Sequence, residues 1–452
     1  MQVPDLEAKL GIEVYATRTQ GIGGCLRLIP EDFIVEEILI DGSLAEVQNV
    51  PELVIAEKGR FLICLLVKKN WDTFLAVRWL AKHLKISEKM VNYAGIKDAR
   101  ALTAQHISIQ NMSSLNLEGA SRSDLKVYPL RFSNRPITAR ALLGNKFRIM
   151  VRNVDSASEQ VKHVVESIRR ELTLLEGVPN FYGHQRFGTV RPVSHIIGRY
   201  LLKGDFEKAV LTFLTEPSPY EPQEASTARK NLLETGDFKA ANTAFPKYLV
   251  YERLMLSRLN NEPKNFVDAF RRLPIRLRKL LVQAYQGYLF NRILSRRIKL
   301  GLALNRVEIG DFALRLDVSR LPRFSVKVTS QNLEEINRQV TLEKMCLGIP
   351  IIGYNNVLSD GKQGEIERQI LTEEQVSLGD FYNRSMPEIS ASSELRVALA
   401  PIEGFIPVTV SEDELNARRY KVGFGFELLK GAYATIVMRE FMKSIDPVKA
   451  GY

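Results

Sequence analysis

The stretch Tyr93–Ile109, YAGIKDARALTAQHISI, places a short charged loop directly before a strand pattern. Its last part, His106–Ile109, alternates polar and apolar residues, which predicts a half-buried β-strand. In the loop, Asp98 lies between Lys97 and Arg100. Because nearby opposite charges favour the ionised form, we expect Asp98 to be an anion at neutral pH. Such a carboxylate suits a nucleophile or an orienting group, and a solvated surface turn is the structural alternative.

Other segments on both sides of this loop have strand and helix patterns. Residues 60–69 form an apolar run that predicts a buried strand, and Asp72–Thr73 can cap the helix that follows. Residues 145–152 alternate in the manner of a strand, and the chain returns to a strand and then a helix at 422–427 and 432–442. The chain therefore carries strand patterns near both of its ends.

Upstream of the loop, residues 30–37 (PEDFIVEE) predict a further extended segment. On composition, Phe33 and Val35 would face the core and the acidic residues would face solvent. Downstream, residues 177–188 (GVPNFYGHQRFG) interleave three aromatic residues with His184 and Arg186. A loop of this composition can supply base stacking and phosphate contacts, and an aromatic structural turn is the alternative.

Length and cysteine spacing limit the class of protein. At 452 residues the chain is long enough for two or three domains, and 45% hydrophobic content is typical of a globular protein. No apolar run approaches membrane-spanning length, and the first residues do not have the pattern of an export signal. Cys25, Cys64 and Cys346 lie far apart, which indicates reduced thiols. We therefore expect a cytoplasmic protein.

Positive charge is concentrated in one part of the chain. The net charge is +11, and residues 247–306 contain fourteen Lys and Arg against three acidic residues. Such a segment is typical of a polyanion binder, and a solvated helical face is the alternative. A helix that begins at Pro274 would place Arg276, Lys279 and Arg297 on one flank, where we expect them to contact phosphates.

The opening stretch resembles the GxKDxxAxTxQ signature of the TruD family of tRNA pseudouridine synthases, and an archaeal-type member in particular. The residues in register are Gly95, Lys97, Asp98, Ala101, Thr103 and Gln105. In that family the aspartate of this loop is the catalytic nucleophile, so the resemblance implies that role for Asp98. It also implies a role for Lys97 in the same site.

Further motifs are similar to the same family. The PEDFxVxE segment and a basic residue before it imply that Arg27 and Phe33 belong to the active site. Gly144–Phe147 matches GNxF, in which Asn145 would contact the nucleophile and Phe147 would stack on the target base. The remaining implied substrate-binding residues, from GVPNxxGxQRFG, are His184 and Arg186. The closing segment resembles FxLPxGxYAT, with Leu429 in place of the usual proline.

The resemblance also implies the architecture. We expect an α/β (α+β) fold with the mixed, largely antiparallel sheet of pseudouridine synthases. The catalytic domain would comprise residues 1–176 and 401–452, and a mainly α domain of residues 177–400 would be inserted into it. The inner part, from about residue 190 to 280, matches the family weakly and carries no recognisable motif of its active site.

The chemistry that fits these residues needs neither a metal nor a cofactor. The chain has no HExxH, CxxC, Walker or GxSxG motif, and its five histidines lack metal-ligand spacing. Pseudouridine formation breaks the N-glycosidic bond and rejoins the same base through carbon, which one anionic carboxylate can assist. Asp98 could attack the sugar, attack the base or remove a sugar proton.

The resemblance implies uridine 13 of tRNA as the substrate, and we expect a monomer that contacts no membrane. A non-catalytic RNA-binding module and a base-excising hydrolase, with Asp98 as the general base, are the alternatives.

Overall fold

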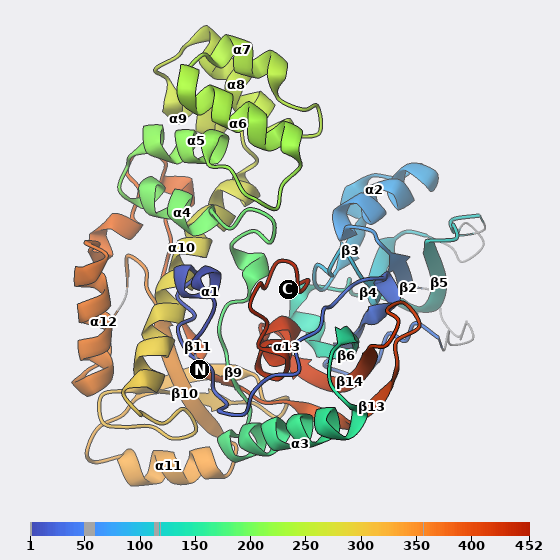
Figure 1. The fold of residues 1–452 in the computed structure, drawn as a ribbon, viewed down its shortest axis with the longest axis vertical. Helices are drawn as coiled ribbons and strands as arrows, with labels where there is room; N and C mark the ends of the chain where they lie inside the picture. Colours follow the sequence, from blue (N-terminus) through green and yellow to red (C-terminus); the bar gives the residue numbers. More distant parts are fainter. Residues whose placement is uncertain (1, 49–58, 113–116, 118, 356) are drawn as a thin grey trace.

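A computed structural model describes residues 2–48, 59–112, 117, 119–355 and 357–452 (Figure 1). Its largest feature is a mixed sheet in the order β13-β14-β6-β1-β4-β2-β5, with β3 paired to β4. The strands are β1 (Phe33–Leu39), β2 (Phe61–Lys69), β3 (Val91–Tyr93), β4 (Leu102–Gln110), β5 (Leu125–Ser133), β6 (Leu142–Val154), β13 (Glu403–Glu412) and β14 (Tyr420–Leu429). Of the described pairs, β1–β4 is parallel and the others are antiparallel. The predicted fold class is confirmed.

Strands from the two ends of the chain meet in this sheet. β6 pairs with β1 on one side and with β14 on the other, so that Phe147 lies between Val35 and Phe426. Arg152 of β6 is buried and binds Asp413 with a distance of 2.8 Å between Nη1 and Oδ1. The sheet is therefore complete only when β13 and β14 have joined it.

Helices cover the sheet. Asp72 caps α2 (Thr73–His83) as expected, because its carboxylate accepts the N–H groups of Phe74 and Leu75 at 2.7 and 3.2 Å. The apolar side of α2 packs on β2 and β4 in one core cluster. The helices α3 (Ser158–Leu175) and α13 (Ala434–Met442) join a larger cluster with β6 and β14.

Two expectations about exposure are wrong. The strand that contains His106 is buried along most of its length rather than half-buried, because β4 lies between β1 and β2 and α2 covers it. The acidic residues Glu36 and Glu37 of β1 are buried rather than solvent-facing. Alternation along one strand cannot show that both faces of a sheet are covered.

Residues 178–400 form the second half of the molecule, which lies on the left and at the top of Figure 1. Its helices are α4 (Ser194–Leu202), α5 (Phe206–Thr215), α6 (Gln223–Thr235), α7 (Phe238–Ala244), α8 (Val250–Asn261), α9 (Phe266–Arg271), α10 (Ile275–Lys299), α11 (Leu333–Thr341) and α12 (Gly361–Glu373). A second sheet has the order β11-β10-β8-β9 and is formed by β8 (Phe312–Leu316), β9 (Pro322–Lys327), β10 (Met345–Ile351) and β11 (Glu394–Val397). The pair β7 (Val178–Pro179) and β12 (Leu399–Ala400) joins the ends of this half.

The long helix α10 is the centre of this half. Gly198 allows α4 to approach it closely, since a Cβ at that position would lie 2.2 Å from the Leu281 carbonyl oxygen. The segment after α1 (Asp5–Lys9) also packs on α10. Asn291 donates to the Leu10 carbonyl oxygen at 3.0 Å, and Ser295 donates to that of Gly11 at 2.8 Å.

The expectation that Arg297 contacts phosphate is wrong, because its side chain is buried in the core. Its guanidinium binds Asp311 at 2.8 Å and donates to Gln363. Arg276 and Lys279, at the other end of α10, are exposed. Among the helices that the structure describes, none is long and apolar enough to cross a membrane.

Candidate active site

Asp98 lies in the loop between β3 and β4, and buried polar side chains hold this loop. Lys68 of β2 donates to the Asp98 carbonyl oxygen at 2.8 Å and to that of Trp71 at 2.7 Å. Thr73 accepts the N–H of Lys97 at 3.0 Å. Burial lowers the pKa of Lys68 to about 8, although the charges of Asp98 and Asp72 oppose this change.

Several residues of the GxKDxxAxTxQ motif have a structural role. Gln105 of β4 donates to the Gly95 carbonyl oxygen at 3.1 Å, and Ala101 and Thr103 are fully buried. These residues tie the loop to the strand that follows it. The position of Asp98 is therefore set by both ends of its loop.

The Asp98 carboxylate faces Arg27, with 3.7 Å between Oδ2 and Nη2. Arg27 has a φ of 58°, in the left-handed region that costs a non-glycine residue about 1–3 kcal/mol when it is held there. Its Nη1 donates to the Gly451 carbonyl oxygen at 2.8 Å, and its guanidinium lies 4.0 Å from the centre of the Phe33 ring. Within the described ranges, Nε and Nη2 have no hydrogen-bond acceptor although they are buried. Two donors of Arg27 thus remain available in the site.

Lys97, which the sequence places beside Asp98, does not pair with the Asp98 carboxylate. Lys97 turns away from the carboxylate and places its Nζ 2.8 Å from Glu37 and 2.7 Å from the Asn145 amide oxygen. Glu37 also accepts the backbone N–H of His106 at 2.9 Å. Burial opposes the ionisation of Glu37, but the His106 hydrogen bond and the Lys97 charge outweigh it and lower its pKa. Lys97 therefore positions Asn145 and depends on Glu37.

A pocket of about 200 Å³ opens at Asp98. Its walls include the predicted residues Arg27, Phe33, Lys97, Asp98, Asn145 and Phe147. The Phe147 ring packs edge-on against Phe33 at 6.2 Å between ring centres and lies 5.6 Å from Phe426. The structure thus brings together six of the eight predicted site residues.

His184 and Arg186 lie outside this pocket. His184 is buried, with Nε2 3.3 Å from a Glu7 carboxylate oxygen and its ring 5.3 Å from that of Tyr452. The Arg186 guanidinium lies over the Tyr182 ring in a neighbouring cavity. The two residues are therefore not part of the arrangement around Asp98.

Several pocket residues were missed by sequence reasoning. Gln185 lines the pocket and accepts a hydrogen bond from Thr435 at 3.2 Å, and Tyr433 lines it as well. All three lie inside the quoted QRFG and YAT motifs, so the sequence held a signal for them. Glu37 had a weaker signal, because adjacent residues of a strand face opposite sides and one of Glu36 and Glu37 had to face inward.

This arrangement suits chemistry on a flat, neutral ring. A partly exposed carboxylate lies beside a buried guanidinium at the opening of a pocket with aromatic walls. The aromatic walls exclude water, and the carboxylate can attack or remove a proton. Among the described residues, no group of three or more His, Cys, Asp and Glu is placed to hold a metal ion.

Comparisons with known proteins show which proteins the chain is similar to. A family model described as tRNA pseudouridine synthase D (TruD) matches residues 9–441. The chain is 40% identical over 451 residues to a protein of Methanosarcina acetivorans named tRNA pseudouridine synthase D, and the match covers 99% of both chains. A protein of the same name from Methanosarcina barkeri is 39% identical, over 99% of this chain and 100% of that one.

A solved structure is also similar over the whole chain. The crystal structure of a tRNA pseudouridine synthase D (TruD) from Methanosarcina mazei has a TM-score of 0.82 and 38% sequence identity. The match covers 99% of this chain and 100% of that chain. Sequence and fold therefore agree on the relatives of this protein.

Proposed function

The chain belongs to the TruD family of tRNA pseudouridine synthases, and on that premise we propose that it modifies uridine 13 of tRNA with Asp98 as the catalytic group. As a member of the family it is an isomerase that converts uridine in tRNA to pseudouridine. The observation that carries the proposal is the Asp98 carboxylate, 3.7 Å from the buried Arg27 at the opening of the aromatic pocket.

The residues of the pocket have different roles in the proposed reaction. The target uridine leaves the RNA stack and enters the pocket, where Phe147 supplies an aromatic wall. Asp98 then attacks the sugar, attacks the base or removes a sugar proton, and the N-glycosidic bond breaks. Arg27 holds the carboxylate, and Asn145 is held by Lys97. The freed base turns within the pocket and rejoins the same sugar through a ring carbon. That carbon loses its proton and the ring nitrogen that left the sugar carries one, so the product is an isomer of uridine.

The proposed domain division is that of the sequence motifs. Residues 1–176 and 401–452 would form the catalytic domain, and residues 177–400 the inserted domain. The pairing of β6 with β14 supports a catalytic sheet built from both ends of the chain. The packing of residues 10–11 on α10 adds a contact between the first segment and the inserted half.

The Asp98→Asn variant tests the assignment of the catalytic group. We expect it to fold and bind tRNA normally but to form no pseudouridine, because the amide has nearly the same shape and is not a nucleophile. The measurement is pseudouridine mapping at nucleotide resolution in tRNA treated with wild type or variant. Turnover by the variant would contradict the assignment.

The same mapping tests the substrate position and the alternatives. Pseudouridine at position 13 is the expected product of the wild-type enzyme. Pseudouridine only elsewhere would contradict the proposed position. Unchanged uridine would indicate a non-catalytic RNA-binding protein, and an abasic site would indicate a base-excising hydrolase.

A further inference from the structure

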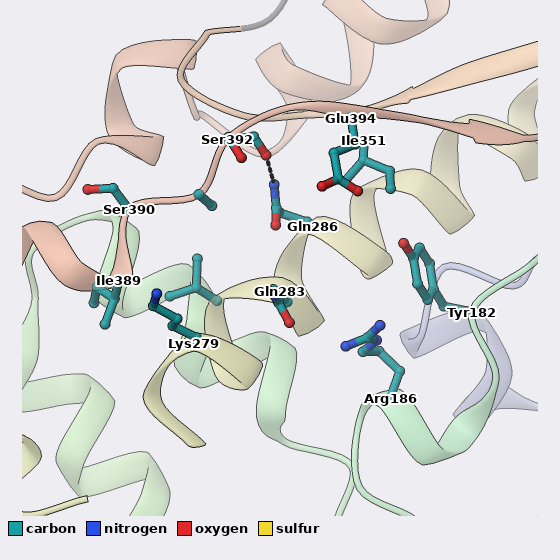
Figure 2. Close-up of a pocket in the computed structure, with 12 residues that line it drawn as sticks. Tyr182, Arg186, Lys279, Gln283, Gln286, Ile351, Ile389, Ser390, Ser392 and Glu394 are labelled. Carbon is teal, nitrogen blue, oxygen red and sulfur yellow. Dashed lines mark hydrogen bonds between the residues drawn. The ribbon is translucent and has the colours of Figure 1, made fainter. Parts of the chain in front are cut away.

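A second cavity, of about 300 Å³, lies beside the Asp98 pocket and is shown in Figure 2. Its walls come from the segment after β7, from α10, from Ile351 of β10 and from residues 389–392 and 394. One loop serves both cavities, because Gln185 lines the Asp98 pocket and the next residue, Arg186, lines the second. The rings of Tyr182, in the second cavity, and Tyr433, in the first, pack edge-on at 6.2 Å. The two cavities are thus immediate neighbours.

Arg186 is held so that its guanidinium faces the cavity. It lies 5.0 Å from the centre of the Tyr182 ring, and the Arg396 guanidinium lies 4.2 Å from the same centre. Gly287 of α10 makes room for this arrangement, since a Cβ there would lie 3.2 Å from the Tyr182 ring and 3.4 Å from Arg186 Cγ. In Figure 2 the guanidinium points toward Gln283. Its Nε is buried and finds no acceptor among the described residues.

Lys279 supplies a second cation from α10. Within the described chain, the ion pairs of this helix use five of its cations and leave Arg276 and Lys279 without a carboxylate partner. The paired residues are Arg278, Arg292, Arg296, Arg297 and Lys299. Lys279 is exposed and lines the cavity. The cavity therefore combines two cations that form no salt bridge with a carboxylate of the described residues, although Glu394 also lines it.

Polar groups that can read a base edge complete the cavity. Gln286 has a structural role in the cavity wall, because its amide N–H groups already donate to the carbonyl oxygens of Ile352 at 2.7 Å and Ser392 at 3.0 Å. Gln283 and Glu394 are exposed and line the cavity. The Tyr182 ring offers no free stacking position, since two guanidinium groups contact it. A ligand here would be recognised by charge and by hydrogen bonds.

We propose that this cavity is a second nucleotide subsite, which holds a nucleotide of the RNA next to the target uridine. Arg186 and Lys279 would bind its phosphate, because cations without partners form strong charge-assisted bonds with phosphate oxygens. Gln283 and the Glu394 carboxylate would accept hydrogen bonds from an amino group on its base. The inference rests on the proposed function, because a uridine turned out into the Asp98 pocket separates its neighbours from the stack.

The first experiment removes the two cations. The double change Arg186→Gln and Lys279→Gln should weaken tRNA binding about a hundredfold or more at low salt, because two bonds between charged groups are removed. It should also reduce the slope of log affinity against log salt by ~0.7–0.9 for each phosphate that the variant no longer binds. Lys362→Gln, which removes an exposed lysine of α12 outside both cavities, is the matched control for Lys279→Gln and should leave the slope unchanged.

The second experiment asks whether a base occupies the cavity. Single abasic nucleotides are placed on either side of the target uridine, and binding is compared for wild type and Gln283→Ala. At one of the two positions, the abasic nucleotide should lower the affinity of the wild-type enzyme for the tRNA. Gln283→Ala should bind intact tRNA more weakly than wild type does. The abasic nucleotide at that position should then cause no further loss of affinity in the variant. If the loss of affinity from Gln283→Ala and the loss from the abasic nucleotide add together at both positions, the base contact is overturned, and the nucleotide subsite with it.

The outcomes separate this inference from the proposed function. A wild-type salt slope in the folded double variant would overturn the subsite even if pseudouridine forms at position 13. A reduced slope with pseudouridine only at another position would support the subsite and overturn the proposed target. If millimolar nucleoside monophosphate displaced tRNA from wild type but not from the double variant, the cavity would be a site for a free nucleotide and the inference would be wrong.

Discussion

At the scale of single residues, the site depends on charged side chains that position Asp98 and Asn145. Arg27 faces Asp98, whereas Lys97 is bound by Glu37 and Asn145. The sequence predicted Asp98, because its loop has a local signature and a strand follows directly. It could not predict the partners of Lys97, because Glu37 comes from β1 and reaches the loop only when β1 pairs with β4.

The Glu37→Gln variant tests this buried pair. Both side chains are almost fully buried, so removing one charge leaves the other without a partner, which typically costs ~3–5 kcal/mol of unfolding free energy. We expect a loss of this size in denaturant unfolding. Addition of Lys97→Met should restore part of it, because the unpaired ammonium group is then gone. Additive losses in the double variant would contradict a direct interaction.

The contribution of Glu37 to stability should depend on pH. Its pKa is lowered in the folded protein, so the folded state binds fewer protons than the unfolded state at intermediate pH. The stabilisation is present above the unfolded pKa of ~4.3 and is lost as pH falls through the lower folded value. The difference in unfolding free energy between wild type and Glu37→Gln should therefore shrink below about pH 4.

At the scale of helices and strands, the sequence predicted most elements but not their surroundings. The cap of α2 and the alternation of β6 are local, and the structure confirms them. The burial of β4 and of Arg297 depends on elements that cover them from distant parts of the chain. A single helix pattern could not show that Asp311 and Gln363 would meet Arg297.

The contact between α4 and α10 gives a test at this scale. Gly198→Ala would place a methyl group 2.2 Å from the Leu281 carbonyl oxygen and 3.0 Å from Tyr285 Cβ, so the helices must separate. Overpacking of this kind typically costs ~1–3 kcal/mol, and we expect a lower melting temperature. Gly379→Ala is the control, since its Cβ would meet only Ser377 Oγ at 3.7 Å. Equal melting temperatures for the two variants would contradict the close approach.

At the scale of the whole molecule, the pocket joins segments from distant parts of the chain. Asp98, Asn145, Gln185 and Tyr433 all line it, and Arg27 is anchored by the Gly451 carbonyl oxygen. The family signature predicted most of these residues because it runs over most of the chain. The role of Gly451 could not be predicted, since a carbonyl group carries no sequence signal.

Deletion of Gly451 and Tyr452 tests this anchor. Arg27 would lose its hydrogen bond to the Gly451 carbonyl, and bonds to charged groups contribute ~1.5–3 kcal/mol. We expect single-turnover pseudouridine formation to fall about tenfold or more. Tyr452→Phe retains the Gly451 carbonyl and should remain close to wild type. Full activity of the folded deletion variant would show that Arg27 needs no such anchor.

The pairing of β6 with β14 has a consequence for how the enzyme folds during its synthesis on the ribosome. β6 is synthesised early, but its partner emerges only after all of residues 178–400. At roughly 5–20 residues per second, the nascent chain presents an open strand edge for on the order of ten seconds or more. Until then Tyr433 is absent from the pocket. A partly translated chain therefore lacks a complete pocket, and the open edge of β6 is a place where a chaperone can protect it from aggregation.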